Sequence, residues 1–454
     1  MLIEKIKQAG VVGAGGAGFP THAKLNAKAD CFIVNAAECE PLIETDKYIC
    51  RNHADELIDT ITKVGAHLGA QRLVIALKRK YKREISSLKA AISKAQANIE
   101  LFLMDAFYPS GDEQVLVQMV TGNSVPERGI PLAVGCVVDN VGTLIGISDA
   151  LKDIPVTHKY LSVVGEVPTP VMLHVPIGTS LLDCMRAAGM AMDDMDIIVG
   201  GPMMGKVYTS FGEIAQQTVK KTTGNIIVLP KGHYLAQQSK KTLTNIIRQS
   251  QFACLQCRMC TELCPRYQTG HQIRPHMIMR GMFREHLIED VDVYTQMFGE
   301  AANCSSCGLC EMYSCPMKLS PRKVNDYIKT RLREKQIDVP KNQNPIVRTN
   351  MLYAKAPTAR LEARLGLRQY SGLHADDTCI ELTPERIQIA YSQHIGAPAN
   401  PVVKVGDKVS TGDLIAEAPE NSLSARIHSG IAGIVEEVNE NGIIIRNESI
   451  NWNH

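Results

Sequence analysis

Two runs of cysteine constrain this chain more than any other feature of its sequence. The first run reads CLQCRMCTELCP over residues 254–265, and the second reads CSSCGLCEMYSCP over residues 304–316. Each run contains C-x2-C-x2-C and a last cysteine that is followed by proline. Three thiolates at this spacing can wrap around one [4Fe–4S] cluster, whose fourth ligand comes from elsewhere in the chain. The pattern therefore predicts two [4Fe–4S] clusters held close together, an arrangement suited to passing single electrons.

The last cysteine of each run is expected to ligate the cluster of the other run, as in two-cluster ferredoxins. Because the second run has one more residue before its last cysteine, we expect its backbone to bulge there. Zinc and inert thiols are the alternatives, but zinc ribbons use pairs of C-x2-C and not three ligands in tandem. The predicted ligand sets are Cys254, Cys257, Cys260 and Cys315 for one cluster, and Cys304, Cys307, Cys310 and Cys264 for the other.

Length and composition indicate a protein of several domains. The 454 residues suffice for about three domains of ~150 residues each. The formal net charge of +2 gives no indication of binding to nucleic acid or to an anionic membrane. We find no signal-peptide pattern at the N-terminus and no apolar stretch of membrane-spanning length, so we expect a cytoplasmic protein whose thiols are reduced. The six cysteines outside the runs are expected to be small buried apolar residues.

The pattern of apolar residues and turn signals changes along the chain. Short apolar runs such as CFIVNAAE (31–38) alternate with helical patterns at the start, which predicts an α/β domain with a largely parallel sheet. A compact α+β unit follows it, and short β segments with frequent turn signals return near the end. The expected segments are an α/β domain over 1–152, an α+β domain over 153–232, a helical two-cluster module over 240–335, a linker over 336–377 and an all-β domain over 378–454.

A glycine-rich loop, GAGGAG over residues 13–18, satisfies the pattern G-x-G-x-x-G. A Rossmann fingerprint needs a strand before the loop, a helix after it and an acidic residue about 20 positions on. Here a helical pattern precedes the loop, Pro20 follows it closely, and Asp30 comes too early. Glycine-rich backbone can still approach a phosphate or a flat ring closely. A flavin or nucleotide cradle and a merely tight turn both stay open on these residues alone.

Several motifs together resemble known flavin proteins. The segments GAGGAGFPTHAKL, NAAECEP, YPSGDE and NVGT occur in the order seen in the flavin subunit of respiratory complex I and, with a closer likeness, in the C subunit of Rnf complexes. VGGPMMG (199–205) and the segment over 393–417 also fit the Rnf relative. In Rnf the barrel domain precedes the flavin domain, whereas here it comes last. That order resembles the cobalamin reductases of propanediol-utilisation microcompartments, and the likeness covers essentially the whole chain.

This resemblance implies the architecture and the cofactor site. It implies an FMN- and NADH-binding α/β domain, a β-grasp domain resembling soluble-ligand-binding modules, a ferredoxin-like module and a C-terminal barrel-sandwich hybrid domain. FMN would be held by Gly13, Gly15, Gly16, Gly18, Lys24, Asn35, Glu38, Asn140 and Thr143. NADH would lie near Phe19, Glu40, Gly111 and Glu113. Ala14 and Ala37 depart from the complex I pattern, which has arginine and aspartate there.

The resemblance also implies an NADH-dependent oxidoreductase with no catalytic side chain, because hydride transfer takes place on the flavin. Electrons from NADH would pass through FMN and two [4Fe–4S] clusters to a corrinoid, reducing cob(III)alamin to cob(II)alamin and cob(I)alamin and so reactivating cobalamin for a diol dehydratase pathway. A shell protein and an adenosyltransferase are the implied partners, with location inside a bacterial microcompartment, and a homo-oligomer is compatible with this reading.

Two alternatives stay open. One is an Rnf-type peripheral subunit that links NADH to ferredoxin. The other is a non-catalytic electron-relay protein whose flavin site has decayed, for which Ala14 and Ala37 give some room. The barrel segment NSLSARIHSG has no lysine where a carrier domain would be modified, so we expect a docking or structural module there.

Overall fold

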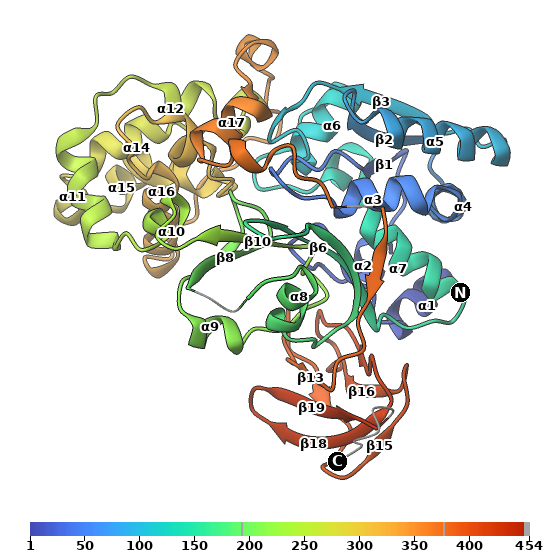
Figure 1. Cartoon of the computed structure of the whole chain (residues 1–454). Helices are drawn as coiled ribbons and strands as arrows, with labels where there is room; N and C mark the ends of the chain where they lie inside the picture. The colour runs from blue at the N-terminus through green and yellow to red at the C-terminus, as the bar shows by residue number, and fades with distance from the viewer. Residues whose placement is uncertain (192–193, 376, 449–454) are drawn as a thin grey trace.

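The computed structural model describes residues 1–191, 194–375 and 377–448. Figure 1 shows an α/β domain, a mixed sheet below it, a helical cysteine-containing module to one side, and a small β unit that carries the C-terminus at the opposite end from the α/β domain. Among the described residues, no helix has both the length and the apolar character needed to cross a membrane.

The first domain is built on a parallel sheet with strand order β3-β2-β1-β5. Side chains alternate across β1: Phe32 and Val34 pack with helices α4, α5 and α7, while Ile33 packs against α6 on the other face. Both faces are therefore covered, which explains the continuous apolar runs of these strands. The bounds are β1 Cys31–Asn35, β2 Arg72–Lys78, β3 Glu100–Met104, β5 Cys136–Asn140, α1 Leu2–Gln8, α2 Thr21–Lys24, α3 Thr45–Asn52, α4 Ala54–Leu68, α5 Lys82–Ala95, α6 Glu113–Thr121 and α7 Val141–Leu151.

The second sheet has six strands in the order β12-β7-β6-β10-β8-β9. One face packs on α8 around Leu161, Leu173 and Ile197. Strand β12 comes from the segment expected to begin the C-terminal barrel, but it pairs with β7 at the edge of this sheet. A strand of three residues carries no pattern that could reveal its partner. The bounds are β6 His158–Gly165, β7 Val171–Pro176, β8 Met195–Val199, β9 Lys206–Tyr208, β10 Asn225–Pro230, β12 Cys379–Glu381, α8 Leu181–Ala187 and α9 Phe211–Ala215.

The cysteine runs lie in a helical module with its own core, which includes Tyr294, Phe298 and Ile328. Helix α16 follows the second run and packs against α11 and α14. The bounds are α10 Tyr234–Ser239, α11 Leu243–Ala253, α12 Met259–Glu262, α13 Pro265–Gln268, α14 Pro275–Gly281, α15 Val291–Phe298 and α16 Pro321–Glu334.

The segment expected to be a linker, 336–377, is largely packed onto the rest of the molecule. Strand β11 (Ala356–Pro357) pairs with β4 (Phe107–Tyr108), and helix α17 (Thr358–Arg364) follows it. Leu361 and Leu365 are fully buried in a core shared with Tyr108 and the second sheet. The apolar residues of this segment are few and interleaved with arginine, so their periodicity is weak in the sequence.

The C-terminal unit consists of two small sheets with a core between them. One has the order β13-β19-β18-β15 and the other β14-β16-β17. Ile387, Ile415 and Val435 are fully or almost fully buried in that core. The bounds are β13 Arg386–Ile389, β14 Asn400–Pro401, β15 Lys408–Val409, β16 Leu414–Glu417, β17 Ile427–His428, β18 Gly433–Asn439 and β19 Gly442–Asn447.

Candidate functional site

The glycine loop 13–18 connects α1 and α2 and folds back on itself. Val12 and Pro20 form a bridge at its base, and the N–H of Gly13 donates to the carbonyl of Phe19 at 2.9 Å. Gly16 and Gly18 have φ angles of +114° and +69°, a backbone region that favours glycine. A Cβ on Gly16 would have no atom within 4 Å, so the backbone there faces open space. The loop therefore fits the close approach of a flat or phosphorylated ligand, and the ring of Phe19 is 38% exposed at its end.

Asn140 and Thr143 join the loop to the start of α7. Asn140 caps this helix by accepting from the N–H of Gly142 at 2.8 Å, and its amide donates to Asp46 at 2.7 Å. Thr143 Oγ1 accepts from the N–H of Ala14 at 2.9 Å. Both residues were predicted as flavin contacts, and the structure brings them to the glycine loop. A helix N-terminus beside a glycine loop is a suitable place for a phosphate.

Lys24 lies at the carboxyl end of β5 within an acidic pair. Its Nζ is 2.9 Å from Glu113 Oε1 and 3.5 Å from Asp139 Oδ1. Burial opposes the charge of Lys24, but the two carboxylates outweigh it and raise its pKa. Burial raises the pKa of Asp139, and its Oδ2 is buried without a partner among the described residues. The sequence predicted Lys24 and Glu113 but missed Asp139, whose only signal is its place before Asn140 at the strand end.

Asn35 and Gly111 meet on the same side of the sheet. The Asn35 amide donates to the carbonyl of Gly111 at 3.0 Å and accepts from the N–H of Ala37 at 3.0 Å. Cys39 Sγ, the Ala37 carbonyl and the Asn35 amide would all lie 3.3–3.4 Å from a Cβ on Gly111. Two motifs far apart in sequence, NAAECEP and YPSGDE, are thus held together by a hydrogen bond from the Asn35 side chain to the backbone of Gly111.

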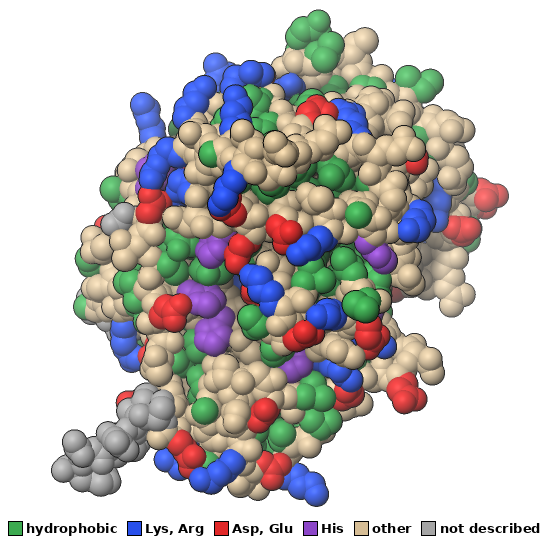
Figure 2. All heavy atoms as spheres, turned by 90° about the vertical axis from the view of Figure 1, so that its right-hand side faces the viewer, with side chains coloured by type: hydrophobic (Ala, Val, Ile, Leu, Met, Phe, Trp, Pro, Cys, Tyr) green, Lys and Arg blue, Asp and Glu red, His purple; other side chains and the backbone are tan. Residues whose placement is uncertain are grey.

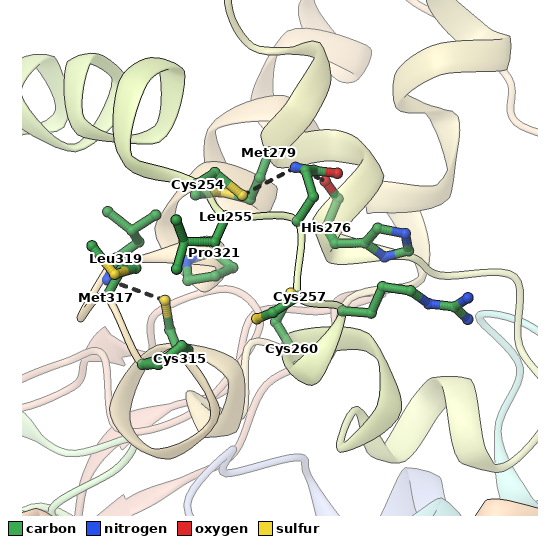
Figure 3. Close-up of a pocket in the computed structure, with 13 residues that line it drawn as sticks. Cys254, Leu255, Cys257, Cys260, His276, Met279, Cys315, Met317, Leu319 and Pro321 are labelled. Carbon is green, nitrogen blue, oxygen red and sulfur yellow. Dashed lines mark hydrogen bonds between the residues drawn. The ribbon is translucent and has the colours of Figure 1, made fainter.

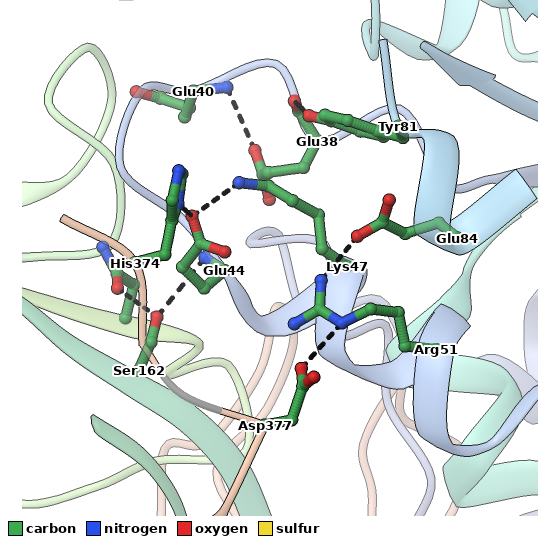
Figure 4. A network of polar contacts seen from close by, with 11 residues as sticks. Glu38, Glu40, Glu44, Lys47, Arg51, Tyr81, Glu84, Ser162, His374 and Asp377 are labelled. Carbon is green, nitrogen blue, oxygen red and sulfur yellow. Dashed lines mark hydrogen bonds and ion pairs between the residues drawn. The ribbon is translucent and has the colours of Figure 1, made fainter. Parts of the chain in front are cut away.

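Glu38 and Glu40 lie close together after β1, within the polar network of Figure 4. Glu38 accepts from the N–H of Glu40 at 3.0 Å, and burial together with Asp46 raises its pKa to about 8. Glu40 accepts from the N–H groups of Met203 and Met204 at 2.7 and 3.0 Å. Burial raises the Glu40 pKa to about 7, although these two donors oppose the shift.

The turn that binds Glu40 requires glycine. A Cβ on Gly201 would lie 2.2 Å from the carboxyl carbon of Glu40, so no larger residue fits without movement. The sequence placed Glu40 near NADH and did not reveal this partner. In the structure Glu40 fastens the α/β domain to the turn of the second sheet that reads VGGPMMG.

One set of four cysteines lines a single cavity, shown in Figure 3. It consists of three cysteines of the first run and the last cysteine of the second run, namely Cys254, Cys257, Cys260 and Cys315. Burial and the neighbouring thiols raise the pKa of Cys260 to about 12, so this thiol resists ionisation unless a positive charge is bound beside it. The donor set and its shape fit an iron–sulfur cluster.

The other four cysteines also come together. Burial raises the pKa of the Cys310 thiol, and the charges that add to this effect belong to neighbouring cysteines, among them Cys304, Cys307 and Cys264. Cys310 begins a π-helical turn, Cys310–Ser314, in which the N–H of Cys315 donates to the Cys310 carbonyl at 3.1 Å. This turn absorbs the extra residue of the second run, and the predicted bulge is confirmed.

No group of three or more His, Cys, Asp or Glu side chains in the described ranges is spaced to hold a single metal ion. A [4Fe–4S] cluster binds each thiolate through a different iron, so its ligands stand farther apart than those around one ion.

The second run adjoins the α/β domain. Tyr108 Oη donates to the Cys307 carbonyl at 2.6 Å. Beside it, Arg266, which directly follows the first run, binds both carboxylate oxygens of Asp112 at 2.6 and 2.9 Å. Arg322 joins the run to the Glu40-binding turn, since it pairs with Glu311 at 3.0 Å and donates to the Met203 carbonyl at 3.3 Å. The sequence predicted none of these contacts, because each joins segments distant along the chain.

The first run faces outward. Cys257 is exposed, and Leu255 and Met317 beside it are 65% and 43% exposed. Both line the cavity of Figure 3. The two thiolate sets therefore differ in their surroundings. The covered set, with Cys307, adjoins the α/β domain. The open set includes the exposed Cys257, although Cys260 and Cys315 of this set are buried.

A cleft of about 330 Å³ lies behind the glycine loop, between the α/β domain and the second sheet. Ala14 and Gly142 line one wall, and a group of stacked rings lines the other. His174 stacks on Tyr160 at a centroid distance of 4.3 Å and on His158 at 5.1 Å. Burial, with a smaller effect of His174, lowers the pKa of His158 to about 4. Histidine side chains gather near the middle of the face seen in Figure 2.

Comparison with known protein families finds three matches along the chain. Residues 6–149 match the Nuo51 FMN-binding domain, residues 253–320 match the 4Fe-4S dicluster domain, and residues 375–449 match the RnfC barrel sandwich hybrid domain. The order of these domains is the predicted one, and the expected FMN and iron–sulfur modules are confirmed at this level.

Curated relatives match over the whole length or over part of it. The chain is 38% identical to cobalamin reductase PduS of Citrobacter freundii, over 97% of this chain and 95% of that protein. It is 37% identical to PduS of Salmonella typhimurium with the same coverage. The C subunit of the proton-translocating ferredoxin:NAD(+) oxidoreductase complex of Clostridium ljungdahlii is 30% identical over 57% of this chain and 54% of that protein.

Proposed function

This chain belongs to the family of cobalamin reductases that PduS represents, and on that premise we propose that it is an oxidoreductase that transfers electrons from NADH, by way of FMN and two [4Fe–4S] clusters, to a corrinoid. The corrinoid is the substrate, reduced from cob(III)alamin to cob(II)alamin and cob(I)alamin. The observation that carries the proposal is the junction of the two halves: Tyr108 of the FMN-type domain donates to Cys307 of the second run, and Asp112 binds Arg266, which lies two residues after Cys264.

The residues around the glycine loop would hold the flavin. When bound, FMN connects two-electron hydride chemistry to one-electron transfer. The open backbone at Gly16 and the N-terminus of α7 suit the ring and the phosphate. The FMN-binding residues we propose are Gly13, Gly15, Gly16, Gly18, Lys24, Asn35, Glu38, Asn140 and Thr143, and those proposed near NADH are Phe19, Glu40, Gly111 and Glu113.

The two carboxylates around Lys24 determine which interaction it can offer a bound flavin. Glu113 and Asp139 already balance its ammonium group, so Lys24 offers a flavin a hydrogen-bond donor more than a free positive charge. The unpartnered Oδ2 of Asp139 is an acceptor on the same side. Together they provide a donor and an acceptor at the carboxyl end of β5, which suits a polar heterocycle.

We also propose that the last cysteine of each run ligates the cluster of the other run, as the cysteine spacing predicts. The cavity that unites Cys315 with the first run supports this. The covered set, Cys304, Cys307, Cys310 and Cys264, lies on the donor side, next to the α/β domain. The open set lies on the acceptor side. Short contacts such as that of Tyr108 to the Cys307 carbonyl keep the distance between donor domain and thiolates small.

The finer assignments rest on the resemblance to the microcompartment enzymes. We assign residues 153–232 to a β-grasp domain. The other proposed segments are the FMN-type domain over 1–152, the two-cluster module over 240–335, the connecting segment over 336–377 and the barrel domain over 378–454, which contributes β12 to the second sheet. A shell protein and an adenosyltransferase are the proposed partners, and the proposed location is the interior of a propanediol-utilisation microcompartment in the cytoplasm.

The decisive experiment is anaerobic oxidation of NADH by the FMN- and cluster-loaded protein, with aquacobalamin as the sole acceptor. We expect the cobalamin absorbance bands to report reduction, and the reaction to stop when FMN is stripped. If NADH reduces the flavin and clusters while cobalamin stays oxidised, the Rnf-type reading takes precedence. If NADH reduces nothing, the protein is an electron relay and the proposal fails.

A further inference from the structure

Asn325 in helix α16 is a buried amide that finds no hydrogen-bond partner among the described residues. Its side chain is fully buried, with 0% exposure. Neither Oδ1 nor Nδ2 has a hydrogen-bond partner, and in the described part of the chain no other residue leaves two side-chain atoms unmatched in this way. An amide buried without partners destabilises the folded state, because it has lost its hydrogen bonds to water. Such a residue calls for a specific explanation.

Helix geometry places Asn325 between neighbours that reach the first thiolate set and neighbours that reach the second run. With 3.6 residues per turn, Pro321 and Ile328 flank it on one side, and Arg322 and Lys329 flank it on the other. Pro321 lines the cavity of the first set, and Ile328 packs in the core that includes Cys315.

The other side of the helix faces the second run. Lys329 Nζ donates to the Cys304 carbonyl at 2.6 Å, and Arg322 pairs with Glu311 at 3.0 Å. One step further round, Asp326 accepts from the Ser306 hydroxyl at 2.5 Å. The side chains that could bind Asn325 on this side are thus already engaged with the run itself.

The start of the same helix shows a second unmatched group. Ser320 is the N-cap residue of α16, but its hydroxyl makes no capping bond and is buried without a partner. It directly precedes Pro321, which lines the first cavity. The helix and its N-cap therefore carry two buried side chains, Asn325 and Ser320, that have no hydrogen-bond partner among the described residues.

We propose that Asn325 donates its amide N–H to a sulfur atom of the [4Fe–4S] clusters and sets their reduction potential. Sulfide and thiolate sulfurs are acceptors only, so they match the donor of the amide. Reduction adds a negative charge to a cluster, and a hydrogen-bond donor stabilises the reduced form more than the oxidised form. Asn325 thereby raises the potential of the cluster it touches. The inference rests on the proposed function only in requiring that the clusters are present.

The test replaces Asn325 by leucine, which has a similar volume and no polar atoms. Both clusters are titrated with dithionite and redox mediators, followed by electron paramagnetic resonance, with no NADH or cobalamin present. We expect the potential of at least one cluster to become more negative in Asn325→Leu at unchanged iron content. Ile328→Val, on the same helix, is the matched control and leaves both potentials in place.

Unchanged potentials in Asn325→Leu, with full iron content, overturn the proposal. If Asn325→Leu fails to assemble clusters, the wild-type protein answers the question through asparagine labelled with ¹⁵N in the side chain. Electron–nuclear double resonance of the reduced clusters is then expected to show coupling to an amide nitrogen. The absence of that coupling also overturns the proposal. Because neither measurement involves cobalamin, a protein that fails as a corrinoid reductase can still confirm or refute the role of Asn325.

Discussion

The two cysteine runs are nearly alike in sequence and lie in different surroundings. The second run is held by Tyr108 and Arg322, which connect it to the α/β domain and to the Glu40-binding turn. The first run has an exposed cysteine, Cys257, and an apolar rim. The same ligand spacing thus serves two positions, one fixed by charge within the molecule and one left accessible. The comparison teaches that ligand spacing determines the cluster type, whereas the surrounding domains determine which neighbours each cluster has.

The largest expected effect comes from removing the cysteine that the second run contributes to the cluster of the first run. In Cys315→Ser we expect loss of the cluster of the first run, although the mutation lies in the second run, and the iron content should fall by about half. Iron analysis and electron paramagnetic resonance measure it. Cys184→Ser, a buried cysteine away from the runs, is the control. Loss of the covered cluster instead would show that each run keeps its own four cysteines.

A second prediction contrasts two arginine–carboxylate pairs, one beside each thiolate set: Arg266 lies near Cys264 and Cys307, and Arg258 lines the cavity of the other set. Arg266 and Asp112 are largely buried, with side-chain exposures of 11% and 14%, whereas Arg258 and Glu262 are exposed, at 54% and 42%. Removal of one partner from a buried pair leaves an uncompensated charge and costs about 3–5 kcal/mol. An exposed pair contributes about 0–1 kcal/mol.

We therefore expect Arg266→Ala to lower the free energy of unfolding in urea by about 3–5 kcal/mol, and Arg258→Ala to change it by less than about 1 kcal/mol. The measurement is made on the cluster-loaded protein under anaerobic conditions. Equal effects of the two substitutions on the free energy of unfolding would contradict the interpretation that the covered thiolate set is the more firmly held of the two.

Glu40, which binds the turn at Met203 and Met204, is expected to make the free energy of unfolding depend on pH. Its folded pKa of about 7 lies above the ordinary value, so the folded protein binds this proton more tightly than the unfolded chain does. The contribution of Glu40 to stability is therefore present at low pH and is lost as the pH rises through 7. We expect the difference in unfolding free energy between wild type and Glu40→Gln to decrease between about pH 5 and pH 7.

The exposed glutamate Glu213 provides the control, because Glu213→Gln should leave the pH profile of stability unchanged. A profile for Glu40→Gln that runs parallel to wild type would show that the contacts to Met203 and Met204 do not depend on the charge of Glu40.

The smallest expected effect concerns how easily a chelator in solution reaches each cluster. Because Cys257 is exposed, an iron chelator should remove iron from the open cluster faster than from the covered one, so iron release should follow two phases. The fast phase should be absent in Cys315→Ser, which lacks the open cluster. A single phase in the wild type would contradict the difference in accessibility.

Much of the site could be predicted from local sequence. The C-x2-C-x2-C spacing predicts clusters because three ligands on one short loop fix the geometry without help from distant residues. The apolar runs of β1 and β2 predict a buried parallel sheet. The likeness of the glycine loop and its companion motifs to known flavin proteins led to the FMN domain, which the family comparison confirms.

Other features could not be predicted in this way. Strand β12 is too short to have a pattern of its own, and its place at the edge of the second sheet depends on β7. Leu361 and Leu365 lie in an arginine-rich segment, and only their burial shows that this segment belongs to a core. Asp139 and the partners of Glu40 have no signature in the sequence.

By itself, the sequence indicated the candidate ligands and the kind of cofactor, because covalent spacing and backbone freedom are local properties. Only the tertiary structure decided which thiolate set adjoins the α/β domain, which carboxylates share Lys24, and that Asn325 is buried without a partner among the described residues. These features depend on contacts between residues distant along the chain, such as Tyr108 with Cys307 and Arg266 with Asp112. Burial and charge at such contacts exist only once the domains have packed together.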